Sequence, residues 1–243
     1  MDSRGKLWVA LDTDKAKSLE IVRKIGRASL PVVRGVKLNR SLDQEVFRLD
    51  GEPRLLWEIN GVGMSAWADI KAYDVPRTVA GRVEIYAKSG LVQYLTVMAK
   101  GGIDMMTEAV KAGGEFFKII AVTELTSLSE EEVHLSSGQP AKASVINLAR
   151  WAVLAGVQYL VCSGQELSVI RKRPELKILK RFAPGVNPSF AAAGADQVRT
   201  MIIVDALKEG ADAVVVGGAI VNASDPVDVV KRITAEIEEA TEK

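Results

Sequence analysis

The fold is indicated most clearly by residues 64–88, which read MSAWADIKAYDVPRTVAGRVEIYAK. Residues 64–70 form a short apolar run of the kind found in buried strands. Pro76 then opens an amphipathic stretch that runs to Lys88, and proline is favoured in the first turn of a helix. The segment therefore predicts one strand followed directly by one helix, with charged residues at the junction.

The same alternation repeats along the whole chain, and eight such units are the number that closes a (β/α)8 TIM barrel. We therefore predict an α/β fold with a single barrel domain over residues 1–243. A doubly wound open sheet is the alternative, but the turn after the first expected strand, Leu11-Asp12-Thr13-Asp14, lacks the glycine usual in such sheets. The expected strands are 7–11, 32–38, 64–70, 91–98, 116–122, 157–162, 178–183 and 213–217, and the expected helices are 14–25, 52–60, 76–88, 103–112, 141–155, 165–173, 197–209 and 226–239.

The composition excludes several classes of protein. The net charge of +1 gives no overall field that would attract nucleic acid or a membrane surface. No apolar stretch approaches the roughly 20 residues that span a bilayer, and the N-terminus has no signal-peptide core. The lone Cys162 ends an apolar run, so we expect a buried structural thiol and a reducing, cytoplasmic location. The low content of Asn and Gln is a feature of thermophilic proteins.

Charged residues gather where the expected strands end. Asp12 ends the first, Lys37 the second, and Asp69 and Lys71 the third, with Asp74 three residues later. Side chains alternate along a strand, so Asp69 and Lys71 are expected on one face. Such a cluster at the C-terminal face of a barrel is either a structural ring of ion pairs or an active site, and these residues alone leave both interpretations open.

The motif around these charges resembles the signature of the orotidine 5′-monophosphate decarboxylase family, Asp-x-Lys-x-x-Asp followed by Ile/Val-Pro-x-Thr-Val. Here it runs from Asp69 to Val79. The resemblance continues in register along most of the chain, at Leu11-Asp12, at Lys37, at Val122-Thr123-Glu124-Leu125-Thr126-Ser127, at Pro184-Gly185-Val186, at Asp196-Gln197-Val198-Arg199 and at Val215-Val216-Gly217.

The resemblance implies a carboxy-lyase that converts orotidine 5′-monophosphate (OMP) to UMP and CO2 in pyrimidine biosynthesis. Lys71 would stabilise the carbanion at pyrimidine C6 and then protonate it. Asp69 would crowd the substrate carboxylate, so that loss of CO2 relieves the repulsion. No metal or organic cofactor is implied, and the single histidine, His134, lies in a polar segment that is unsuited to a zinc site.

The resemblance also implies a homodimer with shared active sites, in which Asp74 and Thr78 complete the partner's site. Asp12 and Lys37 would hold the ribose hydroxyls, Lys37 would also orient Asp69, and either Thr126 or Ser127 would contact the pyrimidine edge. The remaining substrate contacts are expected on the phosphate side, from Pro184, Ser189, Gly217 and Gly218.

The sequence departs from the family pattern mainly at the phosphate site. Relatives typically carry an arginine where Gly218 stands, and many carry another where Asn187 stands. Backbone N–H groups around Gly218 remain as phosphate donors, and Arg77 or Arg199 could supply a charge. Two alternatives follow: a paralogous decarboxylase or aldolase acting on another sugar phosphate, and a barrel that binds a nucleotide without catalysis.

Overall fold

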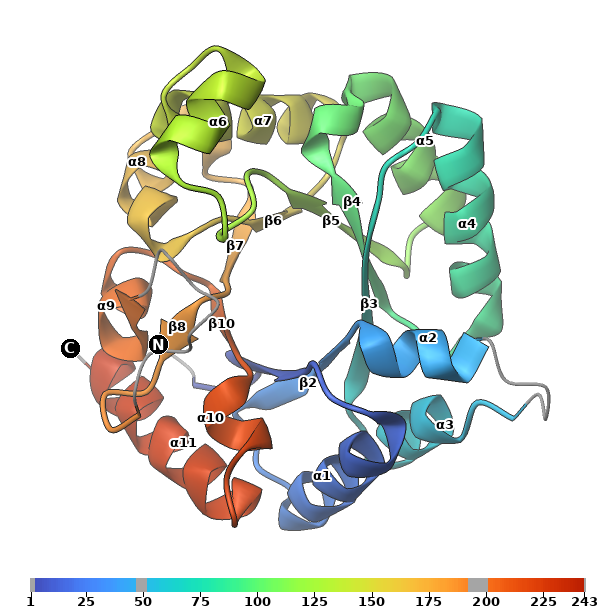
Figure 1. The fold of residues 1–243 in the computed structure, drawn as a ribbon, viewed down its shortest axis with the longest axis vertical. Helices are drawn as coiled ribbons and strands as arrows, with labels where there is room; N and C mark the ends of the chain where they lie inside the picture. Colours follow the sequence, from blue (N-terminus) through green and yellow to red (C-terminus); the bar gives the residue numbers. More distant parts are fainter. Residues whose placement is uncertain (1–2, 47–51, 192–200, 243) are drawn as a thin grey trace.

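The computed structural model describes residues 3–46, 52–191 and 201–242. Within them, eight parallel strands close into a barrel in the order β1-β10-β7-β6-β5-β4-β3-β2 (Figure 1). This closure confirms the predicted barrel and rules out an open doubly wound sheet. The barrel strands are β1 (Leu7–Leu11), β2 (Val33–Leu38), β3 (Ser65–Ala72), β4 (Tyr94–Met98), β5 (Lys118–Val122), β6 (Tyr159–Val161), β7 (Lys180–Ala183) and β10 (Ala213–Val216).

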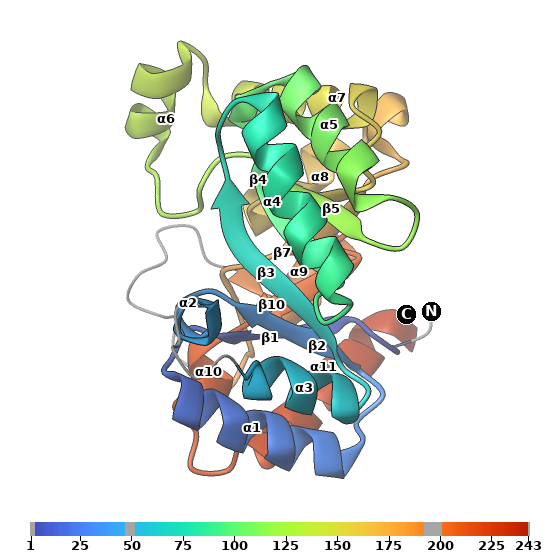
Figure 2. The ribbon, with the colours of Figure 1, turned by 90° about the vertical axis from the view of Figure 1, so that its right-hand side faces the viewer.

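Helices follow the strands and form the outer layer of the barrel (Figures 1 and 2). Local signals in the sequence fix where they begin. The side chain of Asp14 accepts a hydrogen bond from the Lys17 N–H and caps the helix that begins at Lys15. Pro76 is the first residue of the helix that follows β3. The helices of this layer are α1 (Lys15–Ala28), α3 (Arg54–Gly61), α4 (Pro76–Ser89), α5 (Ile103–Gly113), α7 (Ala141–Leu154), α8 (Leu167–Arg171), α9 (Ile203–Lys208) and α11 (Pro226–Glu242).

Two hydrophobic cores stabilise the barrel. The larger lies between the strands and the helices, and a smaller one fills the barrel interior. The interior core is mainly aromatic: Trp8 makes edge-on contacts with Trp67 and Tyr94, at centroid distances of 5.3 and 4.9 Å, and Phe182 packs against both tryptophans. These large rings leave room for a ligand only beyond them, at the C-terminal ends of the strands.

Short elements follow the ends of the barrel strands. They are α2 (Arg40–Val46), α6 (Glu130–Ser137), α10 (Gly218–Val221) and the strand pair β8 (Val186–Asn187) and β9 (Met201–Ile202). None of them was predicted. The helix expected over 197–209 is shorter in the described residues, where α9 follows directly after β9, and residues 192–200 lie outside them. No helix in the described part of the chain is long and apolar enough to cross a membrane.

Candidate functional site

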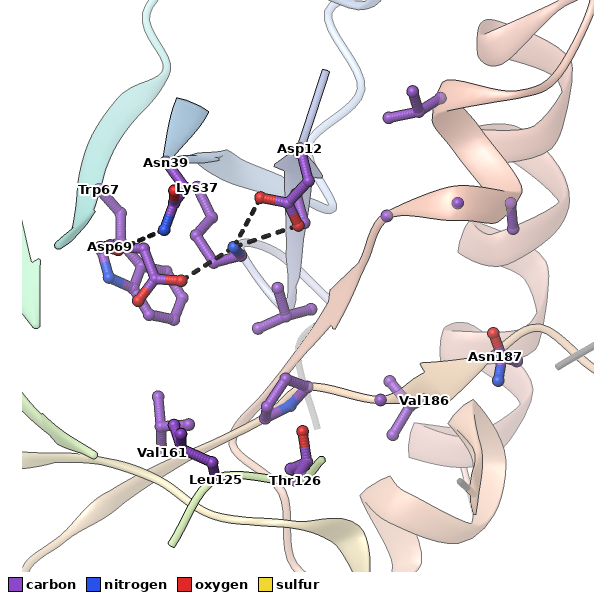
Figure 3. Close-up of a pocket in the computed structure, with 18 of the residues that line it drawn as sticks. Asp12, Lys37, Asn39, Trp67, Asp69, Leu125, Thr126, Val161, Val186 and Asn187 are labelled. Atoms are coloured by element: carbon purple, nitrogen blue, oxygen red, sulfur yellow. Dashed lines mark hydrogen bonds and ion pairs between the residues drawn. The ribbon is translucent and has the colours of Figure 1, made fainter. Parts of the chain in front are cut away.

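A cavity of about 1060 Å³ opens at the C-terminal ends of the barrel strands (Figure 3). Its apolar floor includes Trp67, Val122, Val161 and Val215, which belong to the interior core. Polar and charged groups form the walls, and the volume suits a small organic ligand. The polar and charged wall residues, with the glycines and proline beside them, come from six strand ends and include Asp12, Lys37, Asn39, Arg40, Asp69, Lys71, Glu124, Thr126, Pro184, Asn187, Gly217, Gly218 and Asn222.

Four of the predicted charged residues form one connected network on this wall. The Lys37 Nζ donates to Asp69 Oδ2 at 2.9 Å and to the two carboxylate oxygens of Asp12 at 3.1 and 3.3 Å (Figure 3). Lys71 Nζ reaches the same Oδ2 atom of Asp69 at 2.8 Å. Lys37 and Asp69 are buried, whereas the Lys71 side chain is 34% exposed. Lys71 is therefore the cation of the network that a ligand can most readily contact.

The network keeps its buried members charged. Burial by itself would raise the pKa of Asp69, but the ammonium groups of Lys37 and Lys71 outweigh it and hold that pKa below its ordinary value. Burial likewise opposes the charge on Lys37, and the carboxylates of Asp69 and Asp12 overcome it and raise the pKa of Lys37. A fixed carboxylate thus lies between two ammonium groups at neutral pH.

Asp69 and Lys71 lie on the cavity side of β3, as strand alternation predicts, whereas Ala68, Ile70 and Ala72 pack in the outer core. The register of β3 against β4 nevertheless shifts between Ala68 and Ala72, which marks a bulge. Lys71 adopts a positive φ of 46°, a conformation that residues with a side chain rarely take. The prediction that the two side chains share one face of the strand is confirmed, and Lys71 Nζ meets Asp69 Oδ2 at 2.8 Å within this bulge.

Asp74 and Thr78 do not reach the cavity of their own chain. Both are exposed and lie outside the set of described residues that line it. The Asp74 carboxylate accepts only a local hydrogen bond, from the Val75 N–H at 2.7 Å, among the bonds of the described residues. Beside it, Tyr73 and Val75 are 63% and 62% exposed. The second aspartate of the motif therefore faces outward, next to exposed apolar side chains.

The segment after β5 contributes Leu125 and Thr126 to the cavity wall, whereas Ser127 is exposed and is not among the described lining residues. The preceding Glu124 is buried and was not predicted to matter. Its carboxylate accepts a hydrogen bond from the Ser144 hydroxyl at 2.6 Å and pairs with Lys100 at 2.8 Å. These contacts anchor the segment that carries Thr126 to its neighbours.

The opposite wall, formed after β7 and β10, differs in character. Pro184, Gly217 and Gly218 line it, as predicted, together with Asn187 and Asn222. Among the described lining residues, the cations are Lys37, Arg40 and Lys71, all of which come from β2 and β3 or the residue that begins α2. The wall after β7 and β10 therefore offers neutral donors.

Three residues considered for the phosphate site do not lie in the described wall. The Ser189 hydroxyl donates to the Glu236 carboxylate at 2.6 Å, and Ser189 is not among the described lining residues. Arg77 is likewise exposed outside the cavity lining that the structure describes. Arg199, with the rest of the segment Asp196-Gln197-Val198-Arg199, lies outside the described residues.

Cys162 is fully buried, and burial raises the pKa of its thiol, as a structural cysteine requires. His134 lies in α6, away from the cavity lining. Within the described ranges, no group of three or more His, Cys, Asp or Glu side chains is placed to hold a metal ion.

Comparison with known proteins places the chain in a family. The family described as "Orotidine 5′-phosphate decarboxylase / HUMPS family" matches residues 5–233. The orotidine 5′-phosphate decarboxylase of Streptococcus sanguinis is 36% identical over 199 residues, which cover 81% of this chain and 85% of that protein. The enzyme of the same name from Anaeromyxobacter dehalogenans is 36% identical over 196 residues, which cover 79% of this chain and 83% of that protein.

Solved structures agree with this comparison. The crystal structure of the Lactobacillus acidophilus orotidine 5′-phosphate decarboxylase superposes with a TM-score of 0.76 at 27% identity, over 96% of this chain and 99% of that one. The Methanocaldococcus jannaschii enzyme complexed with the inhibitor BMP has a TM-score of 0.72 at 20% identity, over 96% and 99% of the two chains, and supports the fold. The chain belongs to the orotidine 5′-phosphate decarboxylase / HUMPS family.

Proposed function

We propose that this protein is a carboxy-lyase that converts OMP to UMP and CO2, a step of pyrimidine nucleotide synthesis. The observation that carries the proposal is the Lys37–Asp69–Lys71 network, which keeps a charged carboxylate and a partly exposed ammonium side by side in the cavity wall. Family membership and the names of the relatives support the same reaction.

The proposed chemistry follows from the positions of these charges. With the substrate carboxylate close to Asp69, repulsion between the two anions destabilises the bound substrate and is relieved when CO2 leaves. The bond between C6 and the carboxylate breaks, and its electron pair stays on C6. The Lys71 ammonium stabilises that carbanion because it is already held in place by Asp69. Lys71 then gives a proton to C6 and regains one from solvent.

The cavity walls suggest how the rest of the nucleotide lies. Asp12 and Lys37 are adjacent and polar, which suits the ribose hydroxyls. Thr126 lines the cavity and is the better candidate for the pyrimidine edge, since Ser127 is exposed outside the described lining. The phosphate would lie by Gly217 and Gly218, where first-turn N–H groups lack helical partners.

We further propose a homodimer in which each chain completes the other's site, working in the cytoplasm. Asp74 and Thr78 are exposed, so in this arrangement they would extend from one chain into the cavity of the next. The exposed Tyr73 and Val75 supply apolar surface beside Asp74 that a second copy could bury. The buried, unpaired Cys162 is compatible with a reducing compartment.

One observation favours a second candidate function. The described wall after β7 and β10 lacks a cation for a phosphate dianion, so a paralogous decarboxylase or aldolase with a different sugar phosphate or carboxylate is the alternative. The charge network suits any reaction that forms a carbanion next to an ammonium group.

A substrate comparison tests the proposal. Turnover of OMP is followed by the change in pyrimidine absorbance, in parallel with sugar phosphates that carry a carboxylate or an aldol bond. We expect OMP to have the highest kcat/KM. Turnover of a sugar phosphate, with none of OMP, would replace the proposal with the paralogue, and nucleotide binding without any turnover would indicate a non-catalytic barrel.

A further inference from the structure

The bulge in β3 leaves residues 69–71 without register partners in the described sheet. Within the described strands, residues 69–71 form no register pair with either β2 or β4, whereas Ala68 and Ala72 are paired. Buried backbone N–H and C=O groups need hydrogen bonds from another source. Two side chains on the neighbouring strands supply them here.

Asn39, after β2, and Thr96, on β4, hold the bulge from its two sides. The Asn39 amide donates to the Asp69 carbonyl at 2.9 Å (Figure 3), and the Lys71 N–H donates to Thr96 Oγ1 at 2.9 Å. The second bond fixes the backbone of Lys71 in its positive-φ conformation. Strained residues of this kind persist only where the surroundings hold them, and they cluster at functional sites.

The same hydroxyl also contacts the catalytic carboxylate. Thr96 Oγ1 lies 2.9 Å from Asp69 Oδ1 and 3.4 Å from the Ala68 carbonyl. A hydroxyl has one proton to donate, and the shorter distance and the negative charge assign it to Asp69. The carboxylate is thereby oriented: Oδ1 accepts from Thr96, while Oδ2 accepts from Lys37 and Lys71.

We propose that Thr96 is a positioning residue of this active site, which sets the backbone of Lys71 and the carboxylate plane of Asp69 through one hydroxyl group. The inference rests on the proposed decarboxylation. Thr96 is fully buried and is not among the described residues that line the cavity, so it acts on the reaction through the other two. Its loss should therefore lower the rate of the chemical step more than the affinity for the nucleotide.

Thr96→Val and Thr96→Ala both remove the hydroxyl, and Thr96→Ser keeps it. For either of the first two we expect kcat on OMP to fall about 10- to 100-fold, the worth of hydrogen bonds to a charged group. UMP affinity, measured by calorimetry, should change by less than about threefold, because the walls that bind the nucleotide are unchanged. Thr96→Ser should stay within about threefold of wild type in both quantities. Two hydroxyl-free variants are used so that one remains if the other does not fold.

Thr123→Val is the matched control. Thr123 is also a fully buried threonine on the neighbouring strand end, and its hydroxyl donates to a backbone carbonyl, that of Val161, at 3.0 Å. We expect it to lose stability with little change in kcat. Equal kcat losses in Thr96→Val and Thr123→Val, or a Thr96→Ser variant as slow as Thr96→Ala, would overturn the inference. Absence of OMP turnover in wild type would instead overturn the proposed function.

Discussion

The two ends of the cavity are built on different principles. At the β2–β3 end, four charged side chains are paired with one another, and Asp69 has a partner for each carboxylate oxygen. At the β7–β10 end, the described lining consists of glycines, a proline, asparagines and apolar side chains, without a cation. At the first end the fold holds the charged side chains in place before a ligand binds, whereas the second end can bind an anion only through neutral hydrogen-bond donors.

Because of this difference, we expect the charged end to determine the rate of the chemical step and the neutral end to determine the affinity for phosphate. A buried charge must be paired before any ligand binds, so at the β2–β3 end, the reactive end of the cavity, the lysines and aspartates already neutralise one another in the free protein. A phosphate brings its own charge and can be met by backbone N–H groups, whose bonds are weaker than those of an arginine. We therefore expect substitutions at the two ends to affect different kinetic parameters.

The largest loss of activity is expected from Lys71→Ala. It removes the group that stabilises the carbanion and the proton donor, so we expect kcat on OMP to fall by more than about a hundredfold. Far-ultraviolet circular dichroism should stay unchanged, because the side chain is partly exposed. Lys88→Ala is the control, since Lys88 forms an exposed pair with Glu84 on α4. Activity above a hundredth of wild type would place the chemistry elsewhere.

The shared-site dimer is tested by mixing two inactive proteins. In a mixture of Lys71→Ala and Asp74→Ala chains, one site of each mixed dimer carries neither substitution. Random exchange should therefore restore about a quarter of wild-type activity, since half the dimers are mixed and each has one intact site. Mass spectrometry of the intact dimers verifies the exchange. Mixed dimers that remain inactive would show that the reactive end is complete within one chain.

The pre-organisation of the reactive end also predicts a pH dependence of stability. Burial opposes the charge of Asp69, but Lys37 and Lys71 lower its pKa in the folded protein. A depressed pKa stabilises the fold above the unfolded value of about 3.9, and the contribution is lost as the pH falls through the folded pKa. We expect Asp69→Asn to lower the free energy of unfolding by about 3–5 kcal/mol at pH 7, because Lys71 loses its counterion and Lys37 keeps only Asp12.

Denaturant unfolding of both proteins between pH 7 and 3 measures this effect. The gap in unfolding free energy between wild type and Asp69→Asn should narrow below about pH 4, because the unfolded chain then protonates Asp69 while the folded protein does so only at lower pH. Glu84→Gln, in the exposed pair with Lys88, should change stability by less than about 1 kcal/mol. A gap that stays constant over the whole range would contradict the charge-based account of the network.

The smallest effect on the kinetics is expected from a substitution in the wall after β7 and β10, at Gly218. A β-carbon on Gly218 would meet only the Asn222 amide nitrogen, at 3.8 Å, among the described atoms, so a side chain fits there. Gly218→Arg should lower KM for OMP by roughly tenfold, about the worth of one charge-assisted hydrogen bond, with kcat little changed. Gly218→Met, similar in length but uncharged, should not. A gain with methionine, or none with arginine, would mean that the phosphate lies elsewhere or is already held.

The barrel could be predicted from the sequence because eight short strand-like stretches alternate with helical ones, and several of the former are continuous apolar runs, as strands buried on both faces require. The capping box of Ser129 and Glu132 is a local sequence signal for the start of α6. The bulge at Lys71 could not be predicted, because it depends on how Thr96 and Asn39 from other strands meet the backbone. The pairing of Ser189 with Glu236 is equally non-local.

A single-turnover experiment decides whether the network of Lys37, Asp69 and Lys71 decarboxylates OMP. Wild-type protein in excess over OMP removes the effect of weak phosphate binding, and bound nucleotide is measured in the same sample. We expect UMP and CO2 to appear in equal amounts with wild type, and Lys71→Ala to bind OMP but leave it unchanged. OMP that is bound by wild type and recovered intact would show that the network does not decarboxylate it.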